Sequence, residues 1–192
     1  EAGWELDKEE RGALIQCMIM WTYAPKRGRP TITYAEARRV LMEVSDEDRA
    51  KALGLVARSM SDEMWASFIK PFILDAWPRQ LRYQSEASSR QFAAIAEKGG
   101  DKYPEVVRLI LPYLRPAAHL DTFAFRTQKK DEGGEGYSER FPAETLDLFD
   151  ALIGDDPQTM PWNLGEIVET IAIAAPALRQ SNKWRRLKGM TQ

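Results

Sequence analysis

The chain of 192 residues has 27 lysine and arginine residues against 29 aspartate and glutamate residues, with 44% hydrophobic residues. This length and hydrophobic content are sufficient for a domain with a substantial core. A formal net charge of -2 excludes a chain that is basic throughout, as a general nucleic-acid binder would be, while leaving room for local basic patches.

The single cysteine, Cys17, excludes an internal disulfide bond and favours a reducing, cytoplasmic compartment. Its apolar neighbours indicate a core residue rather than a nucleophile. The longest apolar run, Ala13–Tyr23, is too short to span a bilayer, so no membrane contact is expected. The acidic first residues do not resemble a signal peptide. Because the chain does not begin with methionine, we expect a fragment of a longer protein.

The first third of the chain predicts three amphipathic helices. Glu5–Tyr23 has apolar residues at helical spacing and ends before Pro25. Thr33 followed by Glu36 is a capping-box pattern for a second helix. Ser45, followed by three acidic residues, is the expected start of a third.

The most hydrophobic helix is expected at Ser61–Trp77, where Ser61 is the predicted N-cap. Apolar residues cover more than half of this helix, so it must be covered on two sides. Pro71 interrupts it and predicts a kink or a break into two short helices. The predicted core residues of the segment are Trp65, Phe68, Ile69 and Phe72.

Beyond Pro78, a helix carrying Leu81 and Phe92 on its apolar face is predicted to end at Gly99 and Gly100. Two later segments then resemble each other, since Tyr103-Pro104 and Phe141-Pro142 both begin a helix with an aromatic residue and a proline. Apolar residues recur between them at a spacing of 39: Val107 with Leu146, Ile110 with Phe149, and Leu114 with Ile153. A third, degenerate copy is expected from Met160-Pro161-Trp162.

A helix-pair period near 40 residues is typical of HEAT and armadillo repeats. We therefore predict an all-α fold: an irregular HEAT/armadillo-like helical stack of about eight to ten helices, in a single repeat-like domain over 1–192. Strand should occupy less than about a tenth of the chain. An irregular helical bundle is the alternative. The glycine-rich, charged segment at 128–138 (Gln128–Ser138) is expected to be a flexible insertion.

Motifs for chemistry are weak. The glycines of the 128–138 segment lack the Lys-Ser/Thr ending of a phosphate loop. One histidine, His119, and one cysteine are too few for a structural zinc site, so we expect no metal and no cofactor. His119 with Asp121 is interpreted as part of a turn, because no nucleophile motif accompanies it. The sequence therefore predicts no catalytic residue and no enzyme.

Basic residues gather in local clusters near Lys26, near Arg126 and at the C-terminus. At the C-terminus they alternate with apolar residues, which fits either a phosphate-binding helix or a terminal helix that docks Trp184 and Leu187 and leaves its charges in solvent. The docking interpretation is favoured by the acidic balance of the chain. The candidate contacts to nucleic acid or a partner are Lys183, Trp184, Arg185, Arg186, Lys188, Arg79 and Arg82.

The aromatic-proline helix starts, together with Trp65, Phe68, Trp77-Pro78 and the closing Trp184-Arg185-Arg186-Leu187, carry a resemblance. The chain resembles the C-terminal helical-repeat region of large bacterial anti-phage defence proteins that carry sirtuin-like or NTPase domains upstream. The resemblance implies a cytoplasmic bacterial protein in which this region acts in sensing or assembly, while effector chemistry lies elsewhere. The expected function is a non-enzymatic interaction module that binds a protein partner or other domains of the same chain. A nucleic-acid-binding module is the alternative.

Overall fold

The computed structural model describes residues 33–58, 60–118, 135–155 and 160–191, with Asp7, Glu10, Ala13 and Leu120 as isolated positions. Helices fill most of these residues and no strand occurs among them, which confirms the all-α prediction. The chain divides into two compact units, Glu1–Tyr83 (unit 1) and Gln84–Gln192 (unit 2). The expected helix Glu5–Tyr23 lies outside the described residues, apart from the isolated positions.

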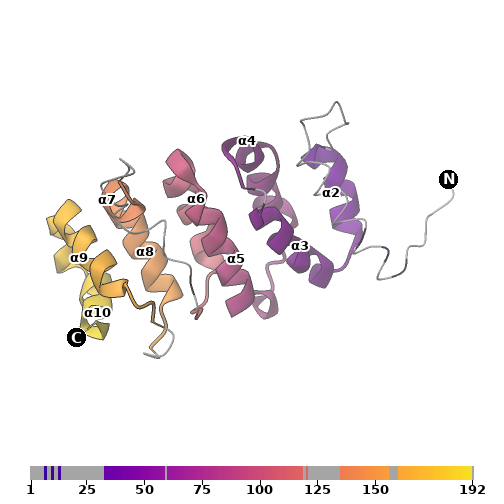
Figure 1. The fold of residues 1–192 in the computed structure, drawn as a ribbon. Coiled ribbons are helices and arrows are strands. Elements are labelled where there is room, and N and C mark those ends of the chain that lie inside the picture. Colours follow the sequence, from indigo (N-terminus) through magenta and orange to yellow (C-terminus); the bar gives the residue numbers. More distant parts are fainter. Residues whose placement is uncertain are drawn as a thin grey trace. The chain divides into compact units, whose positions relative to one another are not determined.

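Unit 1 begins with the predicted capping box. Thr33 accepts a hydrogen bond from the Glu36 backbone amide at 3.3 Å, and the Glu36 carboxylate accepts one from the Thr33 amide at 2.8 Å. Ser61 likewise caps its helix by accepting from Met64 N at 3.2 Å. Its α-helices are α2 (Tyr34–Glu43), α3 (Asp46–Arg58) and α4 (Asp62–Met64), seen in Figure 1.

The inner helix of unit 1 stays helical through Pro71, whose φ is -56° and ψ is -40°. The interruption takes the form of two π-helical segments, η2 (Trp65–Ile69) and η3 (Phe72–Ala76), instead of two separate α-helices. Backbone bonds there reach five residues back, as from Trp77 N to Phe72 O at 2.9 Å. Proline cannot donate to the carbonyl four residues back, and the wider π turns accommodate that missing donor without ending the helix.

The predicted core of this helix is confirmed. All four predicted residues and two further apolar ones have an exposed fraction of 2% or less: Trp65, Phe68, Ile69, Phe72, Ile73 and Trp77. The prediction that Leu81 lies on the apolar face of the next helix is wrong, because Leu81 is 72% exposed. Leu81 belongs to a separate 3-10 turn (η4, Leu81–Tyr83), because Ser85 and Ser88 form a capping box that starts α5 after it.

Unit 2 contains six α-helices among the described residues. They are α5 (Glu86–Glu97), α6 (Tyr103–Ile110), α7 (Tyr137–Arg140), α8 (Pro142–Leu152), α9 (Leu164–Ala174) and α10 (Asn182–Met190). Short 3-10 turns follow or precede them: η5 (Gly100–Lys102), η6 (Leu111–Tyr113) and η10 (Pro176–Gln180). With those of unit 1, the described residues contain nine α-helices, which agrees with the predicted eight to ten.

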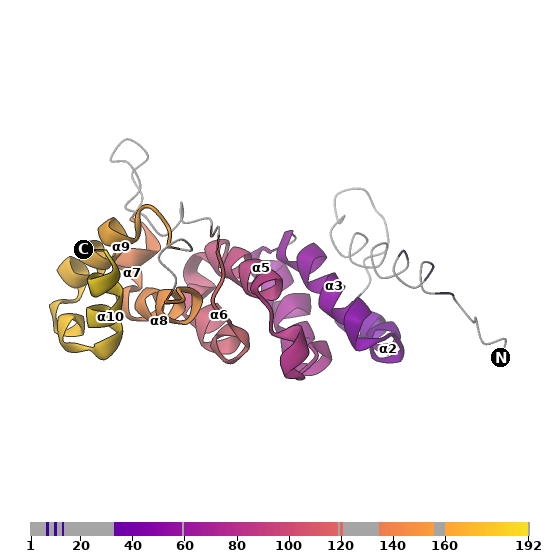
Figure 2. The same ribbon diagram turned by 90° about the horizontal axis from the view of Figure 1, so that it is seen from below.

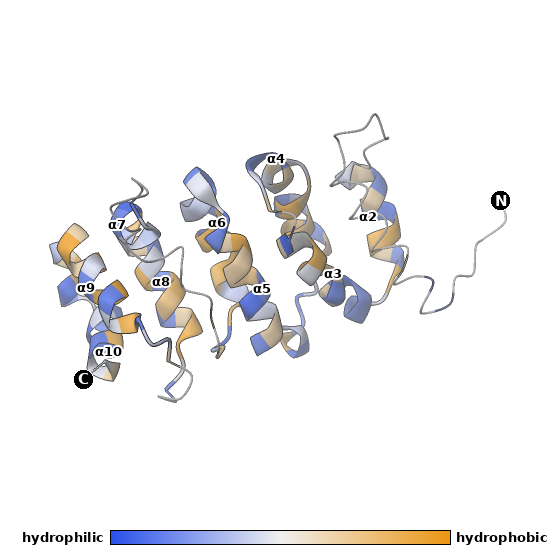
Figure 3. Cartoon of the chain, viewed as in Figure 1, coloured by the Kyte–Doolittle hydropathy of each residue, from blue (hydrophilic) through white to orange (hydrophobic). Residues whose placement is uncertain are grey.

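The helices of unit 2 pack in two layers. Figure 2 shows α7 and α9 on one side and α6, α8 and α10 side by side on the other. Apolar residues lie along α8 and α9, while other faces of the helices carry polar residues (Figure 3). The stack therefore repeats a helix pair, with α8 and α10 as the second members of successive pairs.

The predicted repeat of Tyr103-Pro104 and Phe141-Pro142 corresponds to the starts of α6 and α8. All six apolar residues matched at a spacing of 39 are buried. The expected third copy at Met160-Pro161-Trp162 is misplaced, because it leads into α9, which packs on α7 in the other layer. The equivalent of α6 and α8 is α10, which begins after Ser181 without an aromatic-proline start.

An aromatic cluster joins α6 to α7 and α8. The Tyr103 ring stacks on Tyr137 with centroids 4.1 Å apart, and its hydroxyl contacts Thr145 Oγ1 at 3.2 Å. Burial raises the pKa of the Tyr103 hydroxyl. Tyr137 and Ser138, which the sequence assigned to the insertion at 128–138, instead begin α7 and are buried. Residues 128–134 lie outside the described part of the chain.

Candidate partner or nucleic-acid interface

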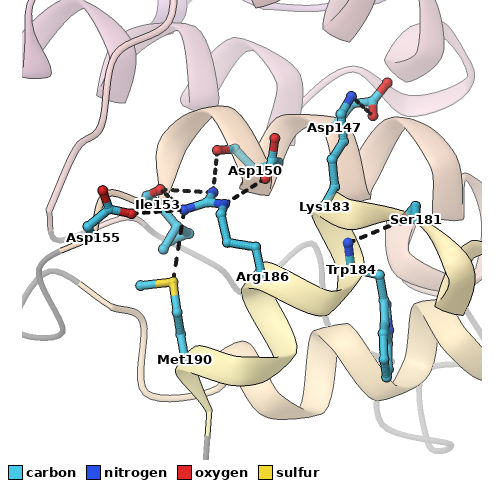
Figure 4. A network of polar contacts seen from close by, with 9 residues as sticks. All are labelled: Asp147, Asp150, Ile153, Asp155, Ser181, Lys183, Trp184, Arg186 and Met190. Carbon is cyan, nitrogen blue, oxygen red and sulfur yellow. Dashed lines mark hydrogen bonds and ion pairs between the residues drawn. The ribbon is translucent and has the colours of Figure 1, made fainter.

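Helix α10 docks through one apolar and one aromatic side chain. Leu187 is completely buried, and Trp184 is half-buried with its Nε1 donating to Val168 O of α9 at 3.1 Å. Ser181 Oγ caps the helix by accepting from Trp184 N at 3.1 Å (Figure 4). The predicted docking of Trp184 and Leu187 is therefore confirmed.

Arg186 is only partly exposed to solvent and is paired within unit 2, in contrast to the expectation that the charges of this helix are left in solvent. Its guanidinium reaches across to the C-terminal end of α8 and donates to Asp150 O at 2.6 Å and Ile153 O at 3.1 Å (Figure 4). Its Nε also donates to the Asp150 carboxylate at 2.9 Å, and Asp155 lies 3.6 Å away. The last carbonyls of a helix have no partner within it, so an arginine from a neighbouring helix can satisfy them.

Two lysines of α10 are also paired within unit 2. Lys183 Nζ donates to Asp147 of α8 at 2.7 Å, and Lys188 pairs with Glu169 of α9. The Lys188 ammonium lowers the pKa of the Glu169 carboxyl, because it donates a hydrogen bond to the charged form. Binding a nucleic-acid phosphate with either lysine would require breaking a pair already formed.

Arg185 differs from its neighbours on α10. It is exposed, and no hydrogen bond or ion pair of its side chain occurs within the described part of the chain. It is the one basic residue of the predicted C-terminal cluster that is presented outward without such a contact.

The two candidates in unit 1 also have intramolecular contacts. Arg79 donates to Ile73 O at 3.1 Å and to Leu74 O, which closes the end of η3 much as Arg186 closes α8. The Arg82 guanidinium lies over the Tyr83 ring, 4.8 Å from its centroid. These contacts lie within unit 1, whereas the contacts of the five candidate residues on α10 lie within unit 2.

Two exposed residues were missed by the sequence reasoning. Trp162 is 80% exposed just before α9, and Ile173 is 73% exposed near its end. The sequence holds a signal for Ile173, because it falls outside the helical spacing of the apolar residues Leu164, Ile167, Val168 and Ile171, all of which are buried. Exposed apolar patches mark interaction sites, which makes Trp162 and Ile173 candidate contacts for a partner.

Among the described residues, no group of three or more histidine, cysteine, aspartate or glutamate side chains is arranged to hold a metal ion. The described helices include none with the length and apolar content needed to cross a bilayer. Cys17, His119, Asp121 and the basic clusters near Lys26 and Arg126 lie outside the described residues.

The chain was compared with protein families, curated proteins and solved structures. No family model matches it, and no solved structure matches it. It is similar to "Uncharacterized protein y4cA" of Sinorhizobium fredii (strain NBRC 101917 / NGR234), with 22% identity over 164 residues. The match covers 82% of this chain and 14% of the length of that protein.

Proposed function

We propose that the chain is a non-enzymatic helical interaction module of a larger bacterial protein, which binds a protein partner or other domains of the same polypeptide. The observation that carries this proposal is the exposure of Ile173 on α9 and of Trp162 just before it, at the last helix pair of a repeating stack. Helical repeats bury their cores between neighbouring pairs and leave long faces for binding. Apolar side chains exposed on such a face are available to a protein surface.

The contacts of the basic residues favour protein over nucleic acid as the partner. Lys183, Arg186 and Lys188 already pair with carboxylates of α8 and α9, so they offer little uncompensated charge to phosphates. Nucleic-acid affinity depends on such charge, because neutralised phosphates release counterions. Arg185 alone would give weak binding with a shallow dependence on salt.

Two assays on the 192-residue chain test the proposal. A gel-shift series with single-stranded and double-stranded DNA and RNA, at roughly 50 and 200 mM salt, should show no tight binding that falls steeply with salt. Tight, salt-sensitive binding lost on replacement of the α10 cations would reverse the assignment to the nucleic-acid alternative.

The second assay uses the chain to capture proteins from its native cells, with each candidate then tested as a purified component. A true partner should bind the parent chain and lose affinity with Ile173→Asp. Leu81→Asp is the matched control, because Leu81 is 72% exposed but belongs to unit 1. A partner that binds both variants with equal affinity would show that the α9 face is not its binding surface.

The resemblance to anti-phage defence proteins sets the proposed biological context: a cytoplasmic defence protein in which this region senses or assembles. The test is the efficiency of phage plating on native cells that carry either the parent gene or the Ile173→Asp variant. Equal plating of a panel of phages on both strains and on a deletion strain would contradict the defence role. The interaction role would then be judged by the binding assays alone.

A further inference from the structure

Contacts between neighbouring helices of unit 2 follow a fixed register. Arg108 of α6 pairs with Glu144 of α8 at 3.2 Å, and Asp147 of α8 pairs with Lys183 of α10 at 2.7 Å. Each of these pairs joins residues that are 36 positions apart in the sequence. In the layer of α6, α8 and α10, each of the first two helices therefore carries a charged side chain that pairs with the next helix, and its partner lies 36 residues later in the sequence.

The equivalent residue on α10 can be identified from the core. Arg108 and Asp147 each precede a buried apolar residue of their helix by two positions, and these residues are Ile110 and Phe149. The same position on α10, two residues before buried Leu187, is Arg185. The charged residues at this position are therefore an arginine on α6, an aspartate on α8 and an arginine on α10. The first two have partners on the next helix, and Arg185 is exposed without one in the described residues.

A second observation concerns the helix that pairs with α10. Five large hydrophobic residues are notably exposed in the described part of the chain, and the two that belong to unit 2 are Trp162 and Ile173. Ile173 lies on α9 and Trp162 lies two residues before its start, in the same last helix pair as Arg185. The last helix pair therefore combines exposed apolar side chains with an exposed cation for which the described residues hold no partner.

We propose that a following helix pair of the same polypeptide packs on the face formed by α9 and α10. The second helix of that pair presents a carboxylate to Arg185. This inference rests on the proposed function and names the partner of that surface. The register places the carboxylate 36 residues after Arg185, at about position 221. The match to only 14% of the Sinorhizobium fredii protein shows that a similar segment occurs within a much longer chain.

The first part of the test is to read the encoding gene beyond Gln192. The proposal expects two further amphipathic helices, with aspartate or glutamate within one or two residues of position 221 and a buried-type apolar residue about 38 residues after Leu187. A reading frame that ends near Gln192, or a continuation that lacks this helix pair, overturns the proposal.

The second part compares the 192-residue chain with the chain extended through that pair. In a Cys17→Ser background, Ile173→Cys should react rapidly with a thiol reagent in the short chain and at least tenfold more slowly in the extended one. Arg185→Glu should lower the unfolding midpoint of the extended chain and leave the short chain unchanged. Lys102→Glu, an exposed charge reversal in η5 just before α6, is the matched control and should change neither chain.

Equal reactivity of Ile173→Cys in both chains overturns the proposal even if Arg185→Glu affects folding. An equal effect of Arg185→Glu on both chains overturns the pairing with a following helix. Neither result decides whether a separate protein binds this region, because the interaction assays on the 192-residue chain measure that independently.

Discussion

The inner helix of unit 1 and helix α10 of unit 2 are held in their units by different interactions. The inner helix contributes a nearly continuous set of buried side chains, with Trp65, Phe68 and Phe72 at 2% exposure or less. Helix α10 buries only Leu187 completely and otherwise relies on Trp184 and on polar contacts to α8 and α9. The comparison shows that a basic, polar helix can be fixed by capping a neighbour, so local charge is a poor guide to what a helix binds.

The largest expected effect is in the inner helix. Phe68→Ala should lower the free energy of unfolding by about 3–5 kcal/mol, because it removes a buried ring and leaves a cavity in a core that cannot fully collapse. The Tyr34 ring would also lose its edge-to-face partner, whose centroid lies 5.6 Å away. Urea denaturation followed by circular dichroism measures the change. A loss below about 1 kcal/mol would show that the comparison overstates the role of this helix.

The corresponding change in α10 is Trp184→Ala, for which we expect a loss of roughly 2–4 kcal/mol. Trp184→Phe separates the two contributions, because it keeps most of the ring but leaves Val168 O without its donor. That variant should cost only about 0.5–1.5 kcal/mol. If Trp184→Ala is as stable as the parent, α10 is not held by its tryptophan, and the contrast with unit 1 becomes sharper.

Arg186→Gln tests the polar attachment of α10. The Arg186 side chain is about a third exposed, so solvent screening reduces the value of its ion pair with Asp150. Its bonds to the α8 carbonyls are the main loss, and we expect a decrease of about 1–2 kcal/mol. Arg185→Gln is the matched control on the same helix and should change stability by less than about 0.5 kcal/mol. Equal effects of the two changes would contradict the capping role.

The sequence predicted those elements whose signals are local. The Thr33–Glu36 capping box, the Ser61 cap and the apolar spacing of the inner helix all depend on residues within a few turns, and each is confirmed. Pro71 was recognised as an interruption, but the choice of π turns over a break depends on packing around the whole helix, which spacing does not report.

The candidate site was harder to predict, because the contacts of its residues come from distant parts of the chain. Arg186 finds its acceptors 33 and 36 residues away, on a helix whose position relative to α10 is a property of the fold. The matching of aromatic-proline starts also gave the wrong third member, since α10 shares the buried register of α8 without sharing its first residues. A search for the 38- to 39-residue spacing of buried positions, extended to Leu187, would have found it.

The smallest expected effect concerns an exposed network that ties α2 to the end of the inner helix. Arg38 and the Tyr34 hydroxyl donate to the Asp75 carboxylate, Tyr34 at 3.0 Å, and these bonds lower the pKa of Asp75 below its ordinary value of 3.8, with Arg38 as the main cause. Because the folded pKa is lower than the unfolded one, the stabilisation is present in full above the unfolded pKa and is lost as the pH falls through the folded pKa. Asp75→Asn should therefore be less stable than the parent at pH 7, and the difference between their urea midpoints should shrink below about pH 4.

Glu169→Gln in unit 2 should behave in the same way, since Lys188 lowers the pKa of Glu169. A difference that stays constant down to pH 3 for Asp75→Asn but shrinks for Glu169→Gln would show that only α10 owes measurable stability to a charged pair.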